Sequence, residues 1–177
     1  LVAVITYEGS PYYHGFSTLA KAVEFAKAGD TITLIRDVTV DELVKIEKAI
    51  TLDLGGKTVT GTAKKVFEVY ANTTIKNGTI NGANRCVDTR KAVELTLDSV
   101  KMVADKYSNA YGNPQPLTIG GSDHGTTVTM NNVEISAKAG YGIITFVKTA
   151  LTATDSTIGG YSALYVKEGS KGSEFSF

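Results

Sequence analysis

Apolar residues recur along this chain at a nearly fixed spacing, and that repeat limits the possible folds more than any other feature. Five segments of similar pattern align on one central apolar position, occupied by Leu52, Ile75, Leu97, Met130 and Ala153. The successive steps are 23, 22, 33 and 23 residues. The long step exceeds the others by about 10 residues, which is typical of one loop insertion in a regular array. The sequence therefore predicts a stack of similar units.

Each unit contains two further features at fixed distances from that position. Five residues after Ile75, Leu97, Met130 and Ala153 lies a second apolar column, made by Ile80, Met102, Ile135 and Ile158. Polar or small residues lie between the two columns, among them Asn77, Ser99, Asn132 and Asp155. A β-branched and aromatic run follows in each unit, at 66–70, 86–89, 117–119, 141–147 and 163–166. Because such runs are typical of strands, each unit is predicted to be a strand, a tight polar bend, a second strand and a third strand.

Three short strands in about 22 residues, repeated along the chain, predict an all-β fold: a right-handed parallel β-helix of about six coils, counted from Thr31. The hand follows from the usual rule for parallel crossovers. Equivalent residues of neighbouring coils would lie about 4.8 Å apart, so inward side chains would form stacks. A β-sandwich with a strand every 8–12 residues or so is the alternative. A sandwich does not require this register, and the β-helix is therefore preferred.

An open β-helix needs caps at its ends. One amphipathic helix is predicted at 17–28, with Ser17 as its N-cap and Gly29 as its C-terminal stop. Its apolar face is formed by Leu19, Ala22, Val23 and Ala26. We therefore divide the chain into an N-terminal cap at 1–30, which consists of a strand and this helix, and a parallel β-helix at 31–177.

No cap is predicted at the other end of the β-helix. Residues 173–177 have the pattern of another coil that stops abruptly. We expect the β-helix to be truncated here and the natural chain to continue. Because an uncapped coil exposes unpaired backbone groups, we also expect end-to-end self-association.

The first coils resemble a known family. Residues 16–23 (FSTLAKAV) and 28–38 (AGDTITLIRDV) resemble the helical cap and first coil of pectate-lyase-like right-handed β-helix domains in large bacterial cell-surface proteins. Residues 50–61 and 74–80 are similar to the next coils of that family, and the match becomes generic after about residue 82. The resemblance implies the fold and an extracellular or cell-surface setting. It implies no activity, because one fold hosts many functions.

The composition excludes several classes of protein. The 177 residues include 18 basic and 18 acidic side chains, so no basic footprint indicates a nucleic-acid partner. The single cysteine excludes an internal disulfide framework and a Cys-rich zinc site. No apolar run approaches the roughly 20 residues of a membrane span, so we expect no membrane insertion. The N-terminus lacks the features of a signal peptide, which we attribute to excision rather than to a cytoplasmic location.

Paired carboxylates are the first catalytic candidates, because glycoside hydrolysis needs two of them about 5–5.5 Å or about 6.5–9.5 Å apart. Asp53 and Asp98 share a predicted column, but Lys76 lies between them, so their separation would be about two coils, or 9.6 Å. An alternating column of acid, base and acid is more simply a surface charge ladder.

A second acidic candidate is Asp88, which lies between Arg85 and Arg90. Its predicted counterparts on the neighbouring coils are Glu68 and Thr118. Calcium needs several converging oxygen ligands, and this set does not supply them. We therefore expect a solvated or salt-bridged strand face.

The remaining reactive side chains suggest no site. His14 and His124 are far apart in the sequence and lack the partners of a zinc site or a catalytic triad. Cys86 begins a strand and is predicted to be a buried, small apolar residue. We predict no catalytic residues, no metal site and no cofactor.

The insertion at 106–125 is the best candidate for binding, because long loops on a rigid solenoid often carry it. Its candidate ligand-binding residues are Tyr107, Asn109, Tyr111, Asn113, Asp123 and His124. Aromatic rings beside amides and acids suit sugars, which offer apolar faces and hydroxyl edges. The alternative is a surface loop whose tyrosines pack back on the coil.

Together these features favour a non-catalytic β-helix module of a bacterial surface or secreted protein. It would act as an adhesin or a rigid spacer, and its partner would be a glycan or another component of a host or cell surface. The alternative is a polysaccharide lyase or glycoside hydrolase fragment of the pectate-lyase-like superfamily. Ice binding is a weaker alternative, suggested by the Thr-x-Thr pairs 31/33, 58/60, 127/129 and 152/154. These pairs are predicted not to share one column, so no flat threonine array is expected.

Overall fold

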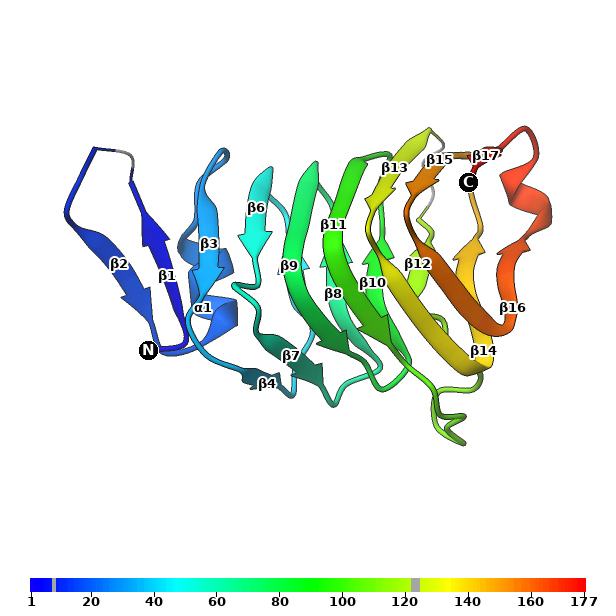
Figure 1. The fold of residues 1–177 in the computed structure, drawn as a ribbon, viewed down its shortest axis with the longest axis horizontal. Coiled ribbons are helices and arrows are strands. Elements are labelled where there is room, and N and C mark those ends of the chain that lie inside the picture. Colours follow the sequence, from blue (N-terminus) through cyan, green and yellow to red (C-terminus); the bar gives the residue numbers. More distant parts are fainter. Residues whose placement is uncertain (8, 122–124) are drawn as a thin grey trace.

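The chain forms a solenoid of parallel strands, seen in a computed structural model that describes residues 1–7, 9–121 and 125–177 (Figure 1). About six coils stack along its long axis, and the two termini lie at opposite ends. The predicted all-β parallel β-helix with one short helix is confirmed. Three faces, each a parallel sheet, surround a single core of buried apolar side chains.

The first face contains the first strand of every coil. These strands are β3 (Thr31–Leu34), β6 (Ile50–Asp53), the first half of β9 (Thr73–Asn81), the first half of β11 (Glu94–Val103), β13 (Thr126–Asn131), β15 (Thr149–Thr154) and β17 (Glu174–Ser176). The predicted column is confirmed, because Leu52, Ile75, Leu97, Met130 and Ala153 pair in register from coil to coil. All five are buried, so the 22- to 23-residue spacing places one side chain per coil in the core.

The second and third faces complete each coil. The second consists of β4 (Val38–Val40), β7 (Thr58–Gly61), the second halves of β9 and β11, and the first parts of β14 (Glu134–Thr145) and β16 (Thr157–Val166). The third consists of β5 (Val44–Ile46), β8 (Lys65–Val69), β10 (Arg85–Thr89), β12 (Leu117–Ile119) and the last parts of β14 and β16, and a 3-10 turn, η1 (Glu168–Ser170), follows it. The second predicted apolar column, Ile80, Met102, Ile135 and Ile158, is in register along the second face.

The bend between the first and second faces has the same backbone conformation in four coils. It is left-handed, with φ values of 58°, 55°, 52° and 50° at Asn77, Ser99, Asn132 and Asp155. Most side chains are strained there, but short polar ones tolerate it because they hydrogen-bond locally. Asn132 Nδ2 donates to Ser99 Oγ on the coil before it, at 3.3 Å. The polar residues predicted at these positions are therefore the ones that turn each coil.

The N-terminal cap differs in detail from its prediction. It contains two antiparallel strands, β1 (Ala3–Thr6) and β2 (Tyr13–Phe16), and a helix α1 that spans only Leu19–Phe25. The predicted helix bounds of 17–28 and the Ser17 N-cap are wrong. Thr18 is the N-cap, because its hydroxyl accepts from Lys21 N at 3.2 Å. The helix ends early because Lys48 Nζ, from the turn between the first and second coils, donates to the carbonyls of Glu24 and Ala26.

The outer side of the first face carries a column that the sequence pattern did not predict. Thr31, Thr51, Thr74, Thr96, Thr129 and Thr152 pair in register, one per coil. One threonine from each of three Thr-x-Thr pairs, Thr31, Thr129 and Thr152, lies in this column, and for these residues the prediction of no shared column is wrong. The adjacent outward column carries Asp53, Lys76 and Asp98, with the Lys76 and Asp53 side chains 3.5 Å apart. The threonines therefore form one column that lies beside a column of charged residues. They do not form the flat, uncharged threonine array that ice binding would require.

Candidate functional site

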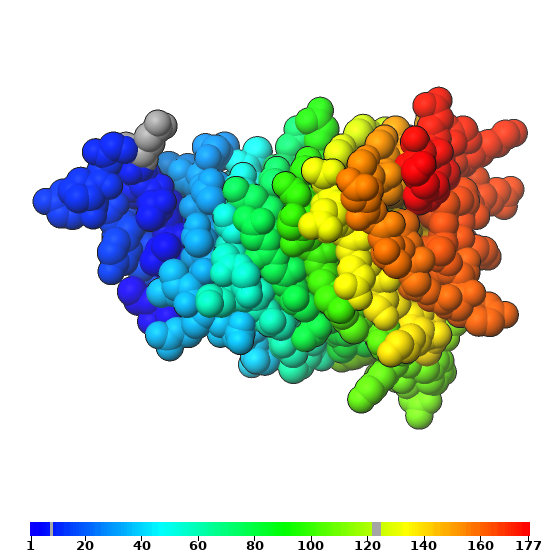
Figure 2. Space-filling model, in the orientation of Figure 1, coloured from blue at the N-terminus to red at the C-terminus, as the bar shows by residue number. Residues whose placement is uncertain are grey.

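The long loop of the solenoid is shorter than the predicted insertion. Residues 104–116 connect β11 to β12, and a second loop begins only after Ile119. Strand β12 thus lies inside the predicted insertion at 106–125, which is not one loop. The insertion loop, as we call residues 104–116, projects from the lower edge of the solenoid as the green protrusion in Figure 2.

A buried asparagine holds the insertion loop against the coil. Asn84 is 1% exposed, and its Nδ2 donates to the carbonyls of Tyr111, Gly112 and Asn113 at 3.4, 3.4 and 2.9 Å. The next coil holds the loop from its other side, since Tyr141 N donates to Pro114 O at 2.9 Å. These bonds satisfy backbone groups that a loop must otherwise leave to water. The loop is therefore attached to the solenoid at its C-terminal half.

The close approach of the insertion loop to the fifth coil also explains why residue 140 is glycine. A Cβ atom added to Gly140 would lie 2.1 Å from Pro114 O, which no real structure tolerates. Only glycine therefore allows the fifth coil to pass beneath the loop.

A cavity of about 750 Å³ opens at the N-terminal half of the insertion loop. Its lining includes the loop residues Asp105, Lys106, Tyr107 and Ser108, together with 81–83 and 103–104. The Tyr107 side chain is 59% exposed, so its ring is available to a ligand. An exposed aromatic ring beside an acid, an amine and a hydroxyl combines apolar contact with hydrogen-bonding groups.

Asp105 fixes the wall of this cavity. Ser136 Oγ donates to Asp105 Oδ1 at 2.5 Å, Lys138 N donates to the same oxygen at 3.2 Å, and Lys138 Nζ lies 3.3 Å from Oδ2. Burial alone would raise the pKa of Asp105, but these hydrogen bonds and the Lys138 ammonium outweigh it and hold the pKa below its ordinary value. The carboxylate thus links the start of the insertion loop to the fifth coil.

The structure brings together only some of the predicted binding residues. Tyr107 lines the cavity, whereas Asn109 lies exposed in the turn that the Ser108–Gly112 bridge closes. Tyr111 and Asn113 accept hydrogen bonds from Asn84 through their backbone carbonyls, so their main chains serve to attach the loop. Asp123 and His124 lie outside the described residues.

Sequence reasoning missed Asp105 and Asn84, which position this site. Asp105 lies one residue before the predicted insertion, so a wider window would have included it. Asn84 lies on the coil before the loop, 27 to 29 residues away from its partners. Its role depends on the stacking of two coils, which the spacing predicts only in outline.

A second polar cluster lies on the outer side of the third face. Asp88 is 0% exposed, and its Oδ2 lies 2.8 Å from both Lys65 Nζ and Arg85 Nη1. Arg90 Nη1 lies 3.8 Å from its Oδ1. The predicted salt-bridged face is confirmed, while the solvated alternative is wrong for Asp88, because these three cations and the stacked coils cover it. Asp88 pairs in register with Glu68 and Thr118, as predicted.

Glu68 belongs to the same cluster. It accepts from Lys65 Nζ at 2.5 Å and from Tyr70 Oη at 2.8 Å. Burial raises the pKa of Glu68. The hydrogen bonds and the charges of Lys65 and Arg90 lower it by more, so the net pKa lies below the ordinary value. Both carboxylates of the cluster are thus matched by cations. The cluster therefore lacks the acid and base with separated pKa values that a glycoside hydrolase uses on a bound substrate.

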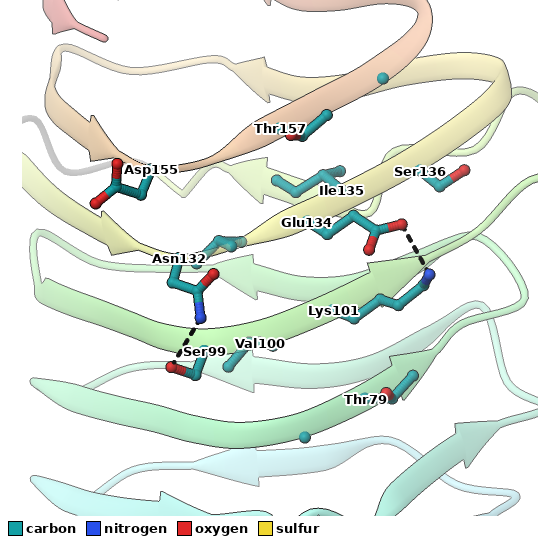
Figure 3. Close-up of a pocket in the computed structure, with 13 residues that line it drawn as sticks. Thr79, Ser99, Val100, Lys101, Asn132, Glu134, Ile135, Ser136, Asp155 and Thr157 are labelled. Atoms are coloured by element: carbon teal, nitrogen blue, oxygen red, sulfur yellow. Dashed lines mark hydrogen bonds and ion pairs between the residues drawn. The ribbon is translucent and has the colours of Figure 1, made fainter.

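A polar groove of about 550 Å³ follows the bends of the later coils (Figure 3). Its larger side chains pair with one another along the solenoid axis. Asn132 bonds Ser99, and Lys101 Nζ lies 2.7 Å from Glu134 Oε1. Because these groups satisfy each other, the groove indicates coil-to-coil stabilisation more than ligand binding.

Other reactive groups form no site within the part of the chain that is described. Cys86 is fully buried, and burial raises the pKa of its thiol to about 12, so it is an unreactive core residue as predicted. Among residues 1–7, 9–121 and 125–177, no three His, Cys, Asp or Glu side chains gather where they could hold a metal ion. The described helices include none with the length and apolarity needed to cross a membrane.

Comparison of the chain with protein-family models, with curated proteins and with solved structures gives no match to any of them.

Proposed function

We propose that this protein is a non-catalytic β-helix module that binds glycans at the cavity beside its insertion loop. The observation that carries the proposal is the exposed Tyr107 ring on a cavity of about 750 Å³ that Asp105, Lys106 and Ser108 also line. A sugar ring can stack its apolar face on the tyrosine and direct its hydroxyls to the polar groups. The rigid coils would hold this surface away from whatever anchors the module.

The surroundings of the cavity support binding without large rearrangement. Asn84 attaches one half of the loop, and Asp105 attaches the other half through Ser136 and Lys138. A loop held in its binding conformation loses little freedom when a ligand arrives, which favours affinity. In keeping with the resemblance of its first coils to bacterial surface domains, we propose a location on the cell surface or outside the cell.

The test is a glycan array probed with the purified chain. We expect binding of a limited set of glycans, and loss of at least about ten-fold in affinity for Tyr107→Ala, because a buried stacking contact contributes on the order of 1.4 kcal/mol or more. Tyr161→Ala is the matched control, since Tyr161 is 85% exposed on the last coil, outside the cavity lining. Equal binding by both variants, or no binding by the parent chain, would overturn the proposal.

The same preparation tests the enzymatic alternative. Incubation with polysaccharides, with and without calcium, is expected to release no unsaturated or reducing sugars. Release that Asp88→Ala or Asp98→Ala abolishes would replace the binding module by a lyase or hydrolase.

A further inference from the structure

We propose that Lys65 and Asp88 join through a spontaneous amide bond between their side chains, with Glu68 as the catalytic proton carrier. The bond would link the second and third coils covalently across the third face. It requires no cofactor and is independent of any ligand that the protein binds.

The backbone places the three side chains on one surface. Strands β8 and β10 pair in register, so that Glu68 lies directly beside Asp88. Cys86 N and Val87 N both donate to Pro116 O, which is the pattern of a β-bulge. A bulge shifts the alternation of side chains by one residue. Residues 65 and 85 can therefore reach the same outer side as residues 68 and 88.

The reacting groups are in contact. Lys65 Nζ lies 2.8 Å from Asp88 Oδ2 and 2.5 Å from Glu68 Oε1, so the amine lies between an electrophile and a base. Groups held this close react as if at an effective concentration of about 10⁵ M or more when their orbitals align. The amine and the base are therefore already in position.

Burial makes the charged starting state costly. The Asp88 side chain is 0% exposed, that of Glu68 is 9% exposed and that of Lys65 is 19% exposed. Asp88 Oδ1 is buried and has no hydrogen-bond partner among the described residues. A buried carboxylate with one unbonded oxygen is unfavourable, whereas an amide carries no charge. Formation of the bond would remove one buried ion of each sign.

The reaction balances without any added reagent. Glu68 Oε1 takes one proton from Lys65 and passes it to Asp88 Oδ1, so that a free amine attacks a neutral carboxyl group at Cγ and forms the C–N bond. Arg85 Nη1, at 2.8 Å from Oδ2, stabilises the negative charge that develops on that oxygen. Oδ1 then leaves as water with two protons, one returned by Glu68 and one from the attacking nitrogen. The products are one amide and one water.

The test is the intact mass of the purified, denatured chain. We expect a mass lower than that of the sequence by one water, and a proteolytic fragment in which the peptides containing Lys65 and Asp88 remain joined. Lys65→Arg should keep the full mass, because arginine preserves the positive charge but provides no such amine. Glu68→Gln should keep the full mass or lose water much more slowly. Circular dichroism would verify that both variants fold.

Lys101 and Glu134 provide an internal control. Their charged atoms are 2.7 Å apart, yet their side chains are 47% and 53% exposed, and among the described residues neither forms a second ion pair. Lys101→Arg should therefore leave the loss of one water unchanged. A parent chain of full mass after prolonged incubation would overturn the proposal. So would a water loss that persists in Lys65→Arg, since it would arise at another site.

Discussion

At the scale of single residues, the insertion loop depends on a few polar side chains that come from other coils. Asp105 accepts hydrogen bonds from Ser136 and Lys138, and Asn84 donates to three loop carbonyls. Each of these contacts joins residues more than 25 positions apart. The loop therefore keeps its shape only while the coils beneath it remain stacked.

The lowered pKa of Asp105 predicts how this anchor responds to acid. Because the folded pKa lies below the unfolded value of 3.8, the carboxylate stabilises the fold above that pH, and the contribution is lost as the pH falls through the folded pKa. Asp105→Asn should lower the melting temperature at pH 7, and the difference from the parent chain should shrink below about pH 3.8. Thermal unfolding at several pH values measures this.

Asp41→Asn is the control for that measurement, since Asp41 is exposed in the turn after β4. It should change the melting temperature little at any pH. A difference in melting temperature between the parent chain and Asp105→Asn that stays constant down to about pH 2 would contradict the prediction. The carboxylate would then not be the stabilising species.

At the scale of elements, the solenoid depends on four bends with the same left-handed backbone. A β-branched side chain is strained in that conformation by roughly 1–2 kcal/mol, whereas glycine is not. The main role of the polar residues at these bends is therefore to adopt the left-handed backbone conformation with little strain. Their side-chain hydrogen bonds to the preceding coil, such as that from Asn132 to Ser99, come in addition.

Asn132 allows the two effects to be separated. Asn132→Val and Asn132→Gly both remove the hydrogen bond to Ser99, but only valine is strained at φ 52°. We expect Asn132→Val to be less stable than Asn132→Gly by about 1–2 kcal/mol in denaturant unfolding. Asn131→Val, in the last strand position before the bend, should be nearly neutral. Equal stability of the valine and glycine variants at 132 would refute the strain argument.

The same elements show which parts of the fold can be predicted from sequence. The columns of Leu52 and Ile80 were predictable. Each coil contributes one inward apolar side chain to a column, so apolar residues recur in the sequence once per coil. The C-terminal end of α1 was not predictable, since Lys48, in the turn after the first coil, terminates the helix. The site was predicted only in part. Tyr107 stands out in a loop, whereas Asn84 acts through a contact that exists only after the coils stack.

At the scale of the whole molecule, the two ends of the solenoid differ. The N-terminal coil is covered by α1 and by the β1–β2 pair. At the other end, β16 pairs only with β14 and β17 only with β15 among the described strands. Tyr161 and Phe177 are 85% and 70% exposed there. Open strand edges of this kind are templates for pairing with another chain.

We therefore expect the 177-residue chain to associate end to end as its concentration rises. Sedimentation velocity should show a larger average mass at high concentration. Tyr161→Lys should reduce it, because Tyr161 is 85% exposed and a charge on the last coil opposes pairing. Asn109→Lys adds the same charge on the exposed loop and should have no effect. A monomer at every concentration would contradict the prediction.

The direction of the hydrogen bonds in this solenoid has a mechanical consequence. Strands run across the long axis, so the backbone bonds that join coils lie along it, and the termini are at opposite ends (Figure 1). Tension applied through the termini would load the coils in series and open them one after another. Each opened coil would release about 22 residues, or roughly 75 Å of chain. Under tension the molecule would lengthen in steps and absorb work at each one. A covalent bond between the second and third coils would prevent those two coils from separating and so remove one step.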